Sequence, residues 1–78
     1  MKKYVSFAGS QEGESFSFVF VDENGDKFFL NELKQPVEGM SPFVYDQIAN
    51  LKNVMVETKD IQGFHYVTRI YLSKKDFR

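Results

Sequence analysis

The side chains best suited to acid–base chemistry in this sequence are Glu57, His65 and Arg69. His65 is the single histidine, and the chain contains no cysteine. A Cys–His pair and a metal site built on two histidines are therefore excluded. Glutamate, histidine and arginine on one sheet could cleave RNA by acid–base catalysis, with the arginine holding a phosphate. The simpler interpretation is that they are outward side chains paired across neighbouring strands, so we predict no catalytic residue and no enzyme.

A second candidate for chemistry is the alternation of Asp22, Asn24 and Asp26, which is similar to the opening of a calcium loop. Such a loop needs glycine at its sixth position and a bidentate glutamate at its twelfth. Here Gly25 stands at the fourth position and Leu33 at the twelfth. Asn24-Gly25 is instead typical of a hairpin turn with positive φ at both central residues. We therefore predict a turn, with no metal and no cofactor.

The composition indicates one small globular domain spanning residues 1–78. Hydrophobic residues make up 42% of the chain and charged residues 27%, with 17% aromatic. Because a secreted domain of this size usually needs disulfides, the lack of cysteine favours the cytoplasm. No apolar run is long enough for a signal peptide or a membrane span. The charged residues 74–78 are expected to form a frayed tail.

Hydrophobic periodicity predicts five strands, over residues 3–8, 14–21, 27–30, 54–59 and 64–73. In the clearest one, Phe16, Phe18 and Phe20 lie on one face at period two. Ser41-Pro42 predicts a helix start, with a capping hydroxyl followed by proline at the first helical position. The helix is expected to run to about residue 51.

The register of the last hairpin depends on the turn around Gly63. Its two apolar sets lie on one side of the sheet only if the hairpin contains a bulge, and Gly63 is the residue best suited to it. We therefore predict a bulge at Gly63. The sets are Val54, Val56 and Thr58 in the first strand, and Phe64, Tyr66, Thr68, Ile70 and Leu72 in the second. The opposite face then carries Met55, Glu57, Lys59, His65, Val67, Arg69 and Tyr71.

These elements predict an α+β fold of about five antiparallel strands in the order β-β-β-α-β-β. One architecture is an open sheet with the helix packed on one face. The other is a small five-stranded barrel, and there the element order resembles the OB-fold, whose helix also lies between the third and fourth strands. The choice depends on whether the strand over residues 3–8 pairs at both edges.

An open sheet would leave its second face exposed and apolar, and such patches mark interfaces. We therefore expect a small non-catalytic protein-binding module, an inhibitor or accessory factor. Its partner would be another protein or a second copy in a homodimer, and no membrane is expected. The interface candidates are Met55, Val67, Tyr71, Val19 and Val21.

The barrel favours an alternative, an OB-like protein that binds single-stranded nucleic acid. Bases would stack on Tyr4, Tyr71 and His65, and phosphates would contact Lys3, Lys59 and Arg69. The net charge of −1 argues against general binding of polyanions.

Overall fold

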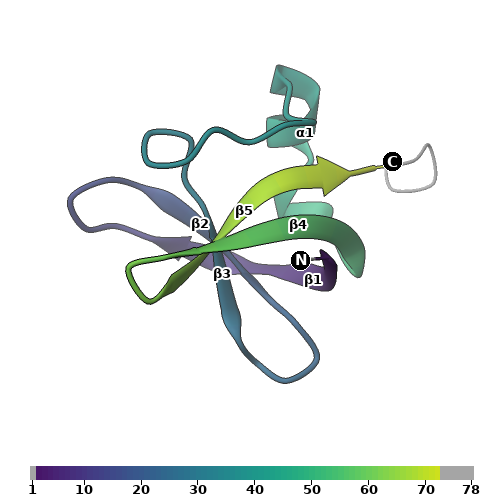
Figure 1. Ribbon diagram of the computed structural model, residues 1–78. Helices are drawn as coiled ribbons and strands as arrows, with labels where there is room; N and C mark the ends of the chain where they lie inside the picture. Colours follow the sequence, from purple (N-terminus) through teal and green to yellow (C-terminus); the bar gives the residue numbers. More distant parts are fainter. Residues whose placement is uncertain (1, 73–78) are drawn as a thin grey trace.

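The computed structural model describes residues 2–72, which form a closed five-stranded barrel with little helix (Figure 1). Neighbouring strands around the barrel follow the order β1-β2-β3-β5-β4. The strands are β1 (Lys2–Gln11), β2 (Ser17–Val21), β3 (Lys27–Leu30), β4 (Val54–Ile61) and β5 (Phe64–Tyr71). The predicted tail at 74–78 lies outside the described residues.

The barrel closes because β1 pairs at both of its edges. Lys2 to Val5 pair with β4, and Ser6 to Gln11 pair with β2. The half that pairs with β2 contains a bulge, because Phe7 opposes Phe20, Gly9 opposes Val19, and Ala8 is the extra residue. Gly9 has a φ of 129°, which a side chain would disfavour. The open-sheet alternative is therefore wrong, whereas the barrel is compatible with the OB-like arrangement.

The seam between β3 and β5 is parallel and short. Phe29 is the register partner of Tyr66, but β3 has only 4 residues. The connection after β3 continues the pairing along β5 through Glu38. The Glu38 N–H donates to the Thr68 carbonyl and the Ile70 N–H donates to the Glu38 carbonyl, each at 2.9 Å. The chain that crosses over the barrel thus completes its wall.

The predicted helix is present but shorter than expected. It consists of α1 (Pro42–Asp46) and a 3₁₀ turn, η1 (Ile48–Asn50). Ser41 caps α1, since its Oγ accepts from the Val44 N–H at 3.3 Å. The helix tightens where the Gln47 N–H donates to the Val44 carbonyl, a 3₁₀ bond. Within residues 2–72, no helix is long and apolar enough to cross a membrane.

The core fills the barrel and the space under η1. Phe20 and Phe28 project inward, and the Phe7 and Phe20 rings meet edge to face with centroids 5.8 Å apart. Ile48 and Leu51 close one end of this core. The completely or almost completely buried large side chains are Phe20, Leu30, Leu51, Val5, Val56 and Val67.

The β4–β5 hairpin contains a bulge, but not at Gly63. Gln62 and Gly63 form a two-residue turn with φ of 51° and 84°, a geometry that matches the twist of the strands. The bulge lies five residues later, where Glu57 opposes Arg69, Thr58 opposes Val67, and Thr68 is extra. Thr68 is also the residue whose carbonyl bonds to Glu38. Because a bulge exchanges the two faces of a strand, only the part of β5 beyond Thr68 has the predicted orientation.

Candidate functional site: an aromatic face on β2, β3 and β5

The displaced bulge turns Phe64 and Tyr66 outward, where they join Phe29. The Phe29 ring centroid lies 6.1 Å from that of Phe64, nearly perpendicular to it at 74°. It also lies 6.1 Å from that of Tyr66, tilted by 49°. Val19, the register partner of Phe29, borders the cluster. These four residues form what we call the aromatic face, on which Phe64 is 55% exposed and Phe29 is half-buried, whereas Tyr66 and Val19 are covered by their neighbours and are 8% and 7% exposed.

Two shallow hollows meet on the aromatic face and share Gln11, Phe29 and Phe64. The smaller, of about 150 Å³, is lined by Gln11, Gly13, Glu14, Ser15, Ser17, Phe29, Asn31, Lys34, Phe64 and Tyr66. The larger, of about 380 Å³, is lined by Gln11, Lys27, Phe29, Gly63, Phe64 and His65. Figure 1 shows the β1–β2 loop and the β4–β5 loop extending on the same side of the barrel. Both loops therefore border the aromatic face.

Asn31 lies at the base of the smaller hollow and holds its lining together by hydrogen bonds. Its Nδ2 donates to Ser15 Oγ at 2.8 Å and to Ser17 Oγ at 3.0 Å. Its Oδ1 accepts from the N–H groups of Leu33 and Lys34 at 3.1 and 3.3 Å. Asn31 is 4% exposed, and its amide thereby joins the β1–β2 loop, β2 and the turn after β3. Buried polar groups with all partners satisfied hold such a site rigid.

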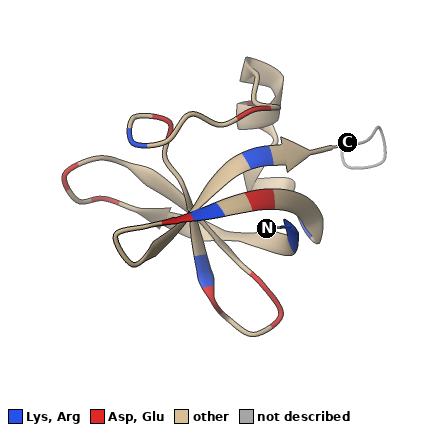
Figure 2. Ribbon diagram, viewed as in Figure 1, with Lys and Arg blue, Asp and Glu red and all other residues tan. Residues whose placement is uncertain are grey.

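Lysines surround the aromatic face, although the chain as a whole is slightly acidic. Lys34 lines the smaller hollow and Lys27 the larger one. Lys59 is the register partner of Tyr66 on the neighbouring strand. Figure 2 shows the acidic residues of the β1–β2 and β2–β3 hairpins gathered in their loops, whereas β4 carries both acidic and basic positions. Glu14 is the acidic residue that lines the smaller hollow.

The three residues weighed for acid–base chemistry are divided between two places. Arg69 forms an ion pair with Glu38, and its Nε lies 3.4 Å from Glu57 Oε2. His65 instead pairs with Asp60 and lies against Phe28, with ring centroids 5.2 Å apart. The expected common face is therefore not formed, because the bulge at Thr68 puts His65 and Arg69 on different sides of β5.

Arg69, Glu57 and Tyr71 form a connected polar group on the outer surface of β4 and β5. The Tyr71 hydroxyl donates to Glu57 Oε2 at 2.6 Å. This bond lowers the pKa of Glu57, and the charge of Arg69 lowers it further. The same bond raises the pKa of Tyr71, while the ion pair with Glu38 raises the pKa of Arg69. Arg69 is thus already neutralised by carboxylates, so it is poorly placed to hold a phosphate.

The interface candidates fall into four groups. Val67 is completely buried in the core, so a partner has no access to it. Met55 and Tyr71 are register partners on the outside of β4 and β5, and Tyr4 of β1 lies opposite Met55. Val19 belongs to the aromatic face, where it is 7% exposed. Val21 lies half-buried near the start of the β2–β3 loop.

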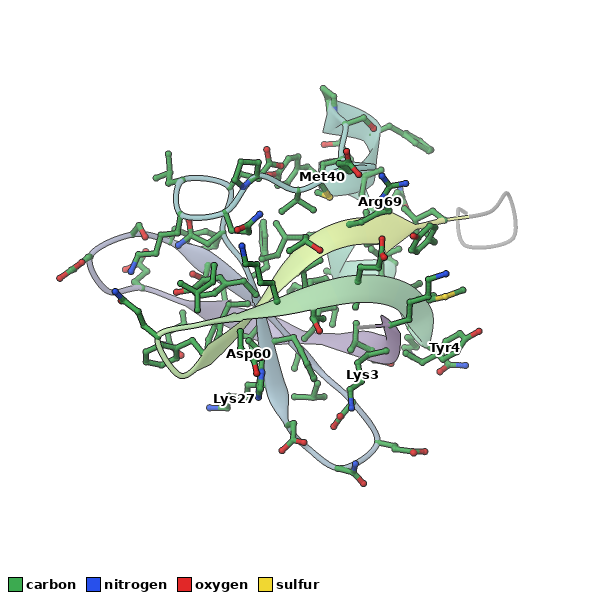
Figure 3. All side chains as sticks on the ribbon, viewed as in Figure 1. Lys3, Tyr4, Lys27, Met40, Asp60 and Arg69 are labelled. Carbon is green, nitrogen blue, oxygen red and sulfur yellow. The ribbon has the colours of Figure 1, made fainter. Side chains whose placement is uncertain are left out.

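The nucleic-acid candidates are divided between two surfaces. Tyr4 is 59% exposed, and with Lys3 it lines a hollow of about 540 Å³ beside the β2–β3 loop. Figure 3 shows Lys3 and Tyr4 on the β1 side of the barrel and Arg69 on β5. Tyr4 and Arg69 border the same surface, because Met55 is the register partner of both Tyr4 and Tyr71, and Arg69 lies over the Tyr71 ring. Of these candidates, only Lys59 and His65 border the aromatic face.

Three residues of the aromatic face were not predicted as site residues from the sequence. They are Phe29, Phe64 and Tyr66. One signal could have revealed them, since a two-residue turn at Gln62-Gly63 puts Phe64 and Tyr66 on the side opposite Val56. Two apolar sets on opposite sides of one hairpin indicate an aromatic outer surface as readily as they indicate a bulge at Gly63.

No protein-family model matches this chain. Neither a curated protein nor a solved structure matches it. Its function is therefore inferred from the barrel and the aromatic face.

Proposed function

We propose that this protein is an OB-like domain that binds single-stranded nucleic acid on the aromatic face. The observation that carries the proposal is the cluster of exposed Phe64, half-buried Phe29 and buried Tyr66 between two loops. Aromatic side chains bind unpaired bases by stacking, at about 1–3 kcal/mol per base. Phe64, with half of its surface open to solvent, is the residue best placed to stack on a base.

The topology supports the same surface. In OB-folds, oligonucleotides bind across the second and third strands, between the loops that follow the first and fourth strands. The aromatic face lies on β2, β3 and the adjoining part of β5, bordered by those two loops. A double helix is less well suited to these shallow hollows, because its bases are stacked on one another and turned inward.

The charge distribution supports a weak and salt-sensitive complex. Lys27, Lys34 and Lys59 surround the aromatic face and can neutralise phosphates of a strand that crosses it. The net charge of −1 limits long-range attraction, so stacking has to supply much of the affinity.

The test is fluorescence anisotropy with a labelled mixed-sequence DNA strand of about 12 nucleotides, within the range of OB-fold site sizes. We expect binding at low salt and a loss of about 5–100-fold in affinity for Phe64→Ala. Tyr4→Ala is the matched control, because Tyr4 is a similarly exposed aromatic residue at 59% but lies on β1 away from the aromatic face. No binding, or an equal loss in both variants, would contradict the proposal.

A second candidate function, binding to another protein, rests on a different surface. Tyr4, Met55 and Tyr71 form a row across β1, β4 and β5, because Met55 is the register partner of both tyrosines. Lys2 and Arg69 lie over the Tyr71 ring at 5.4 and 5.7 Å and give this row a polar rim. Interfaces favour methionine and tyrosine surrounded by such a rim. If the row is an interface, Met55→Glu will turn a dimer or complex into a monomer in light scattering, with DNA binding unchanged.

A further inference from the structure

The β1–β2 loop over residues 12–16 extends beyond the paired residues of both strands. Within residues 2–72, the side chains of this loop make one hydrogen bond, in which Asn31 Nδ2 donates to Ser15 Oγ at 2.8 Å. The Phe16 ring also meets the Phe18 ring edge to face, with centroids 5.0 Å apart. Of these two attachments, only the bond to Asn31 lies in the lining of the smaller hollow. The part of the loop that borders the candidate site is therefore held by Asn31.

The turn after β3 is held by the same side chain. The N–H groups of Lys34 and Gln35 donate to the backbone carbonyl of Asn31 at 3.1 and 2.9 Å, which folds the turn onto itself. The side-chain oxygen of Asn31 also accepts from the Lys34 N–H at 3.3 Å, while its amide nitrogen reaches two serines. One amide group thus connects Ser15 of the loop, Ser17 of β2 and the backbone of Lys34.

The middle and the ends of this connection differ in burial. Asn31 is 4% exposed and Ser17 9%, so this part belongs to the interior, where a hydrogen bond is stronger than in water. Ser15 is half-buried and Lys34 is exposed, and both line the smaller hollow. The connection is therefore fixed in the barrel wall and ends in two residues that a ligand can reach.

Such a connection acts on binding by preorganisation. A loop that is ordered before its ligand arrives does not lose conformational freedom when the ligand binds. For each side chain that would otherwise have to be immobilised, this corresponds to about 2–12-fold in affinity. Without the amide of Asn31, the loop would keep only its contact through Phe16, and the turn that carries Lys34 would lose its attachment to β2.

We propose that Asn31 is a positioning residue for the bound single strand. Its amide group holds the β1–β2 loop and Lys34 in the arrangement that the strand contacts, so it acts through these two neighbours. The inference rests on the proposed function, because the order of the loop and the place of Lys34 affect binding only if a strand crosses the aromatic face.

The test measures two alanine variants by anisotropy with the labelled mixed-sequence strand of about 12 nucleotides. Ser15→Ala removes the bond to the loop but leaves Asn31 bonded to Ser17 and Lys34. We expect it to weaken binding about 2–12-fold, with the salt dependence unchanged. Asn31→Ala should weaken binding at least as much. It should also reduce the magnitude of the slope of log K against log salt by about 0.7, the contribution of one lysine–phosphate contact.

A double-mutant cycle distinguishes positioning from a general loss of stability. In a protein that already carries Lys34→Gln, we expect Asn31→Ala to reduce the slope no further, because the contact that it displaces is already absent. A loss of stability alone changes the fraction of folded protein and leaves the salt dependence of the folded molecules as it was. Urea unfolding will show that each variant is folded at the temperature of the titration.

Ser6→Ala is the matched control for both variants. Ser6 Oγ also ties two segments together, since it accepts from the Asn53 N–H at 2.8 Å. Ser6 lies on β1 and lines the hollow beside the β2–β3 loop, so it is not part of the aromatic face or its hollows. Its replacement should leave both the affinity and the slope unchanged.

Three results would overturn the positioning role. They are an affinity that Asn31→Ala and Ser15→Ala leave unchanged, an equal loss in Ser6→Ala, and a slope that Asn31→Ala does not alter. If Phe64→Ala still weakens binding in any of these cases, the proposed function stands without this role for Asn31. If the original protein binds no strand, the proposed function and the positioning role both fail.

Discussion

Phe29 and Tyr66 lie opposite each other across the parallel pair of β3 and β5, with ring centroids 6.1 Å apart. This pair belongs to the seam that closes the barrel, and its side chains also form the floor of the aromatic face. The same pair of residues therefore closes the barrel and forms part of the candidate site. Anything that weakens this seam is expected to weaken ligand binding as well.

The seam depends on Gly39, which gives the first prediction. Gly39 has a φ of 89°, and a Cβ added to it would lie 2.3 Å from the Ile70 carbonyl oxygen. Because that oxygen belongs to the backbone, it cannot move without disturbing β5. We expect Gly39→Ala to lower the free energy of unfolding by at least about 2 kcal/mol in urea denaturation.

Gly13→Ala is the control for this experiment. Gly13 does not adopt a positive φ, and no atom lies within 4 Å of an added Cβ. Its replacement should change the free energy of unfolding by less than about 0.5 kcal/mol. If the two alanine variants lose equal amounts of unfolding free energy, the loss does not come from a clash with Ile70. That result would contradict the role given to the contact between residues 38 and 70 in closing the barrel.

The second prediction concerns Glu57 and pH. Its pKa is lowered by the Tyr71 hydroxyl and the Arg69 charge, from an ordinary value of 4.5. A carboxylate whose pKa is lower in the folded state stabilises that state above the unfolded pKa, and the effect fades as pH falls through the folded pKa. Glu57→Gln should therefore be less stable than the original protein at neutral pH, and the difference should narrow towards about pH 3. A thermal melting series over this range checks it, and a difference that is independent of pH would contradict the assigned contact.

The third prediction concerns salt. Each lysine–phosphate contact with a single strand contributes about −0.7 to the slope of log K against log salt. If Lys27, Lys34 and Lys59 each make one contact, the slope will be about −2. Replacing any one of these three lysines with glutamine should reduce the magnitude of the slope by about 0.7. Lys52→Gln is the control, because Lys52 is exposed beyond η1 and lines neither hollow, and a slope altered equally by this variant would contradict the assigned path of the strand.

Much of the barrel follows from local sequence signals. The period-two phenylalanines predict the inward face of β2, and Phe18 and Phe20 do pack in or against the core. Phe16 does not, because β2 begins at Ser17 and Phe16 is 47% exposed before it. Ser41 caps the helix as expected, and Val44, Ile48 and Leu51 form its buried stripe. The β2–β3 turn differs in detail, because only Gly25 has a positive φ there and the Asp22 carboxylate accepts from two backbone N–H groups of the loop.

The candidate site could not be predicted in the same way because it depends on long-range contacts. The position of the bulge in β5 is set by Glu38, which pairs with the residues on either side of Arg69 from a segment without clear periodicity. Moving the bulge from Gly63 to Thr68 exchanges the faces of the intervening residues. Phe64 thereby becomes exposed and Tyr66 joins the aromatic face, where it is still only 8% exposed, while Val67 enters the core.

The most direct test of the aromatic face is a titration of the ¹⁵N-labelled protein with a short single strand, followed by NMR. We expect the largest amide shifts in residues 11–19, 27–34 and 62–66, which contain the aromatic face and its two loops. The amides of Tyr4, Met55 and Tyr71, on the opposite row, should shift little. Shifts concentrated on that row, or no shifts at a concentration of strand where anisotropy indicates saturation, would contradict binding on the aromatic face.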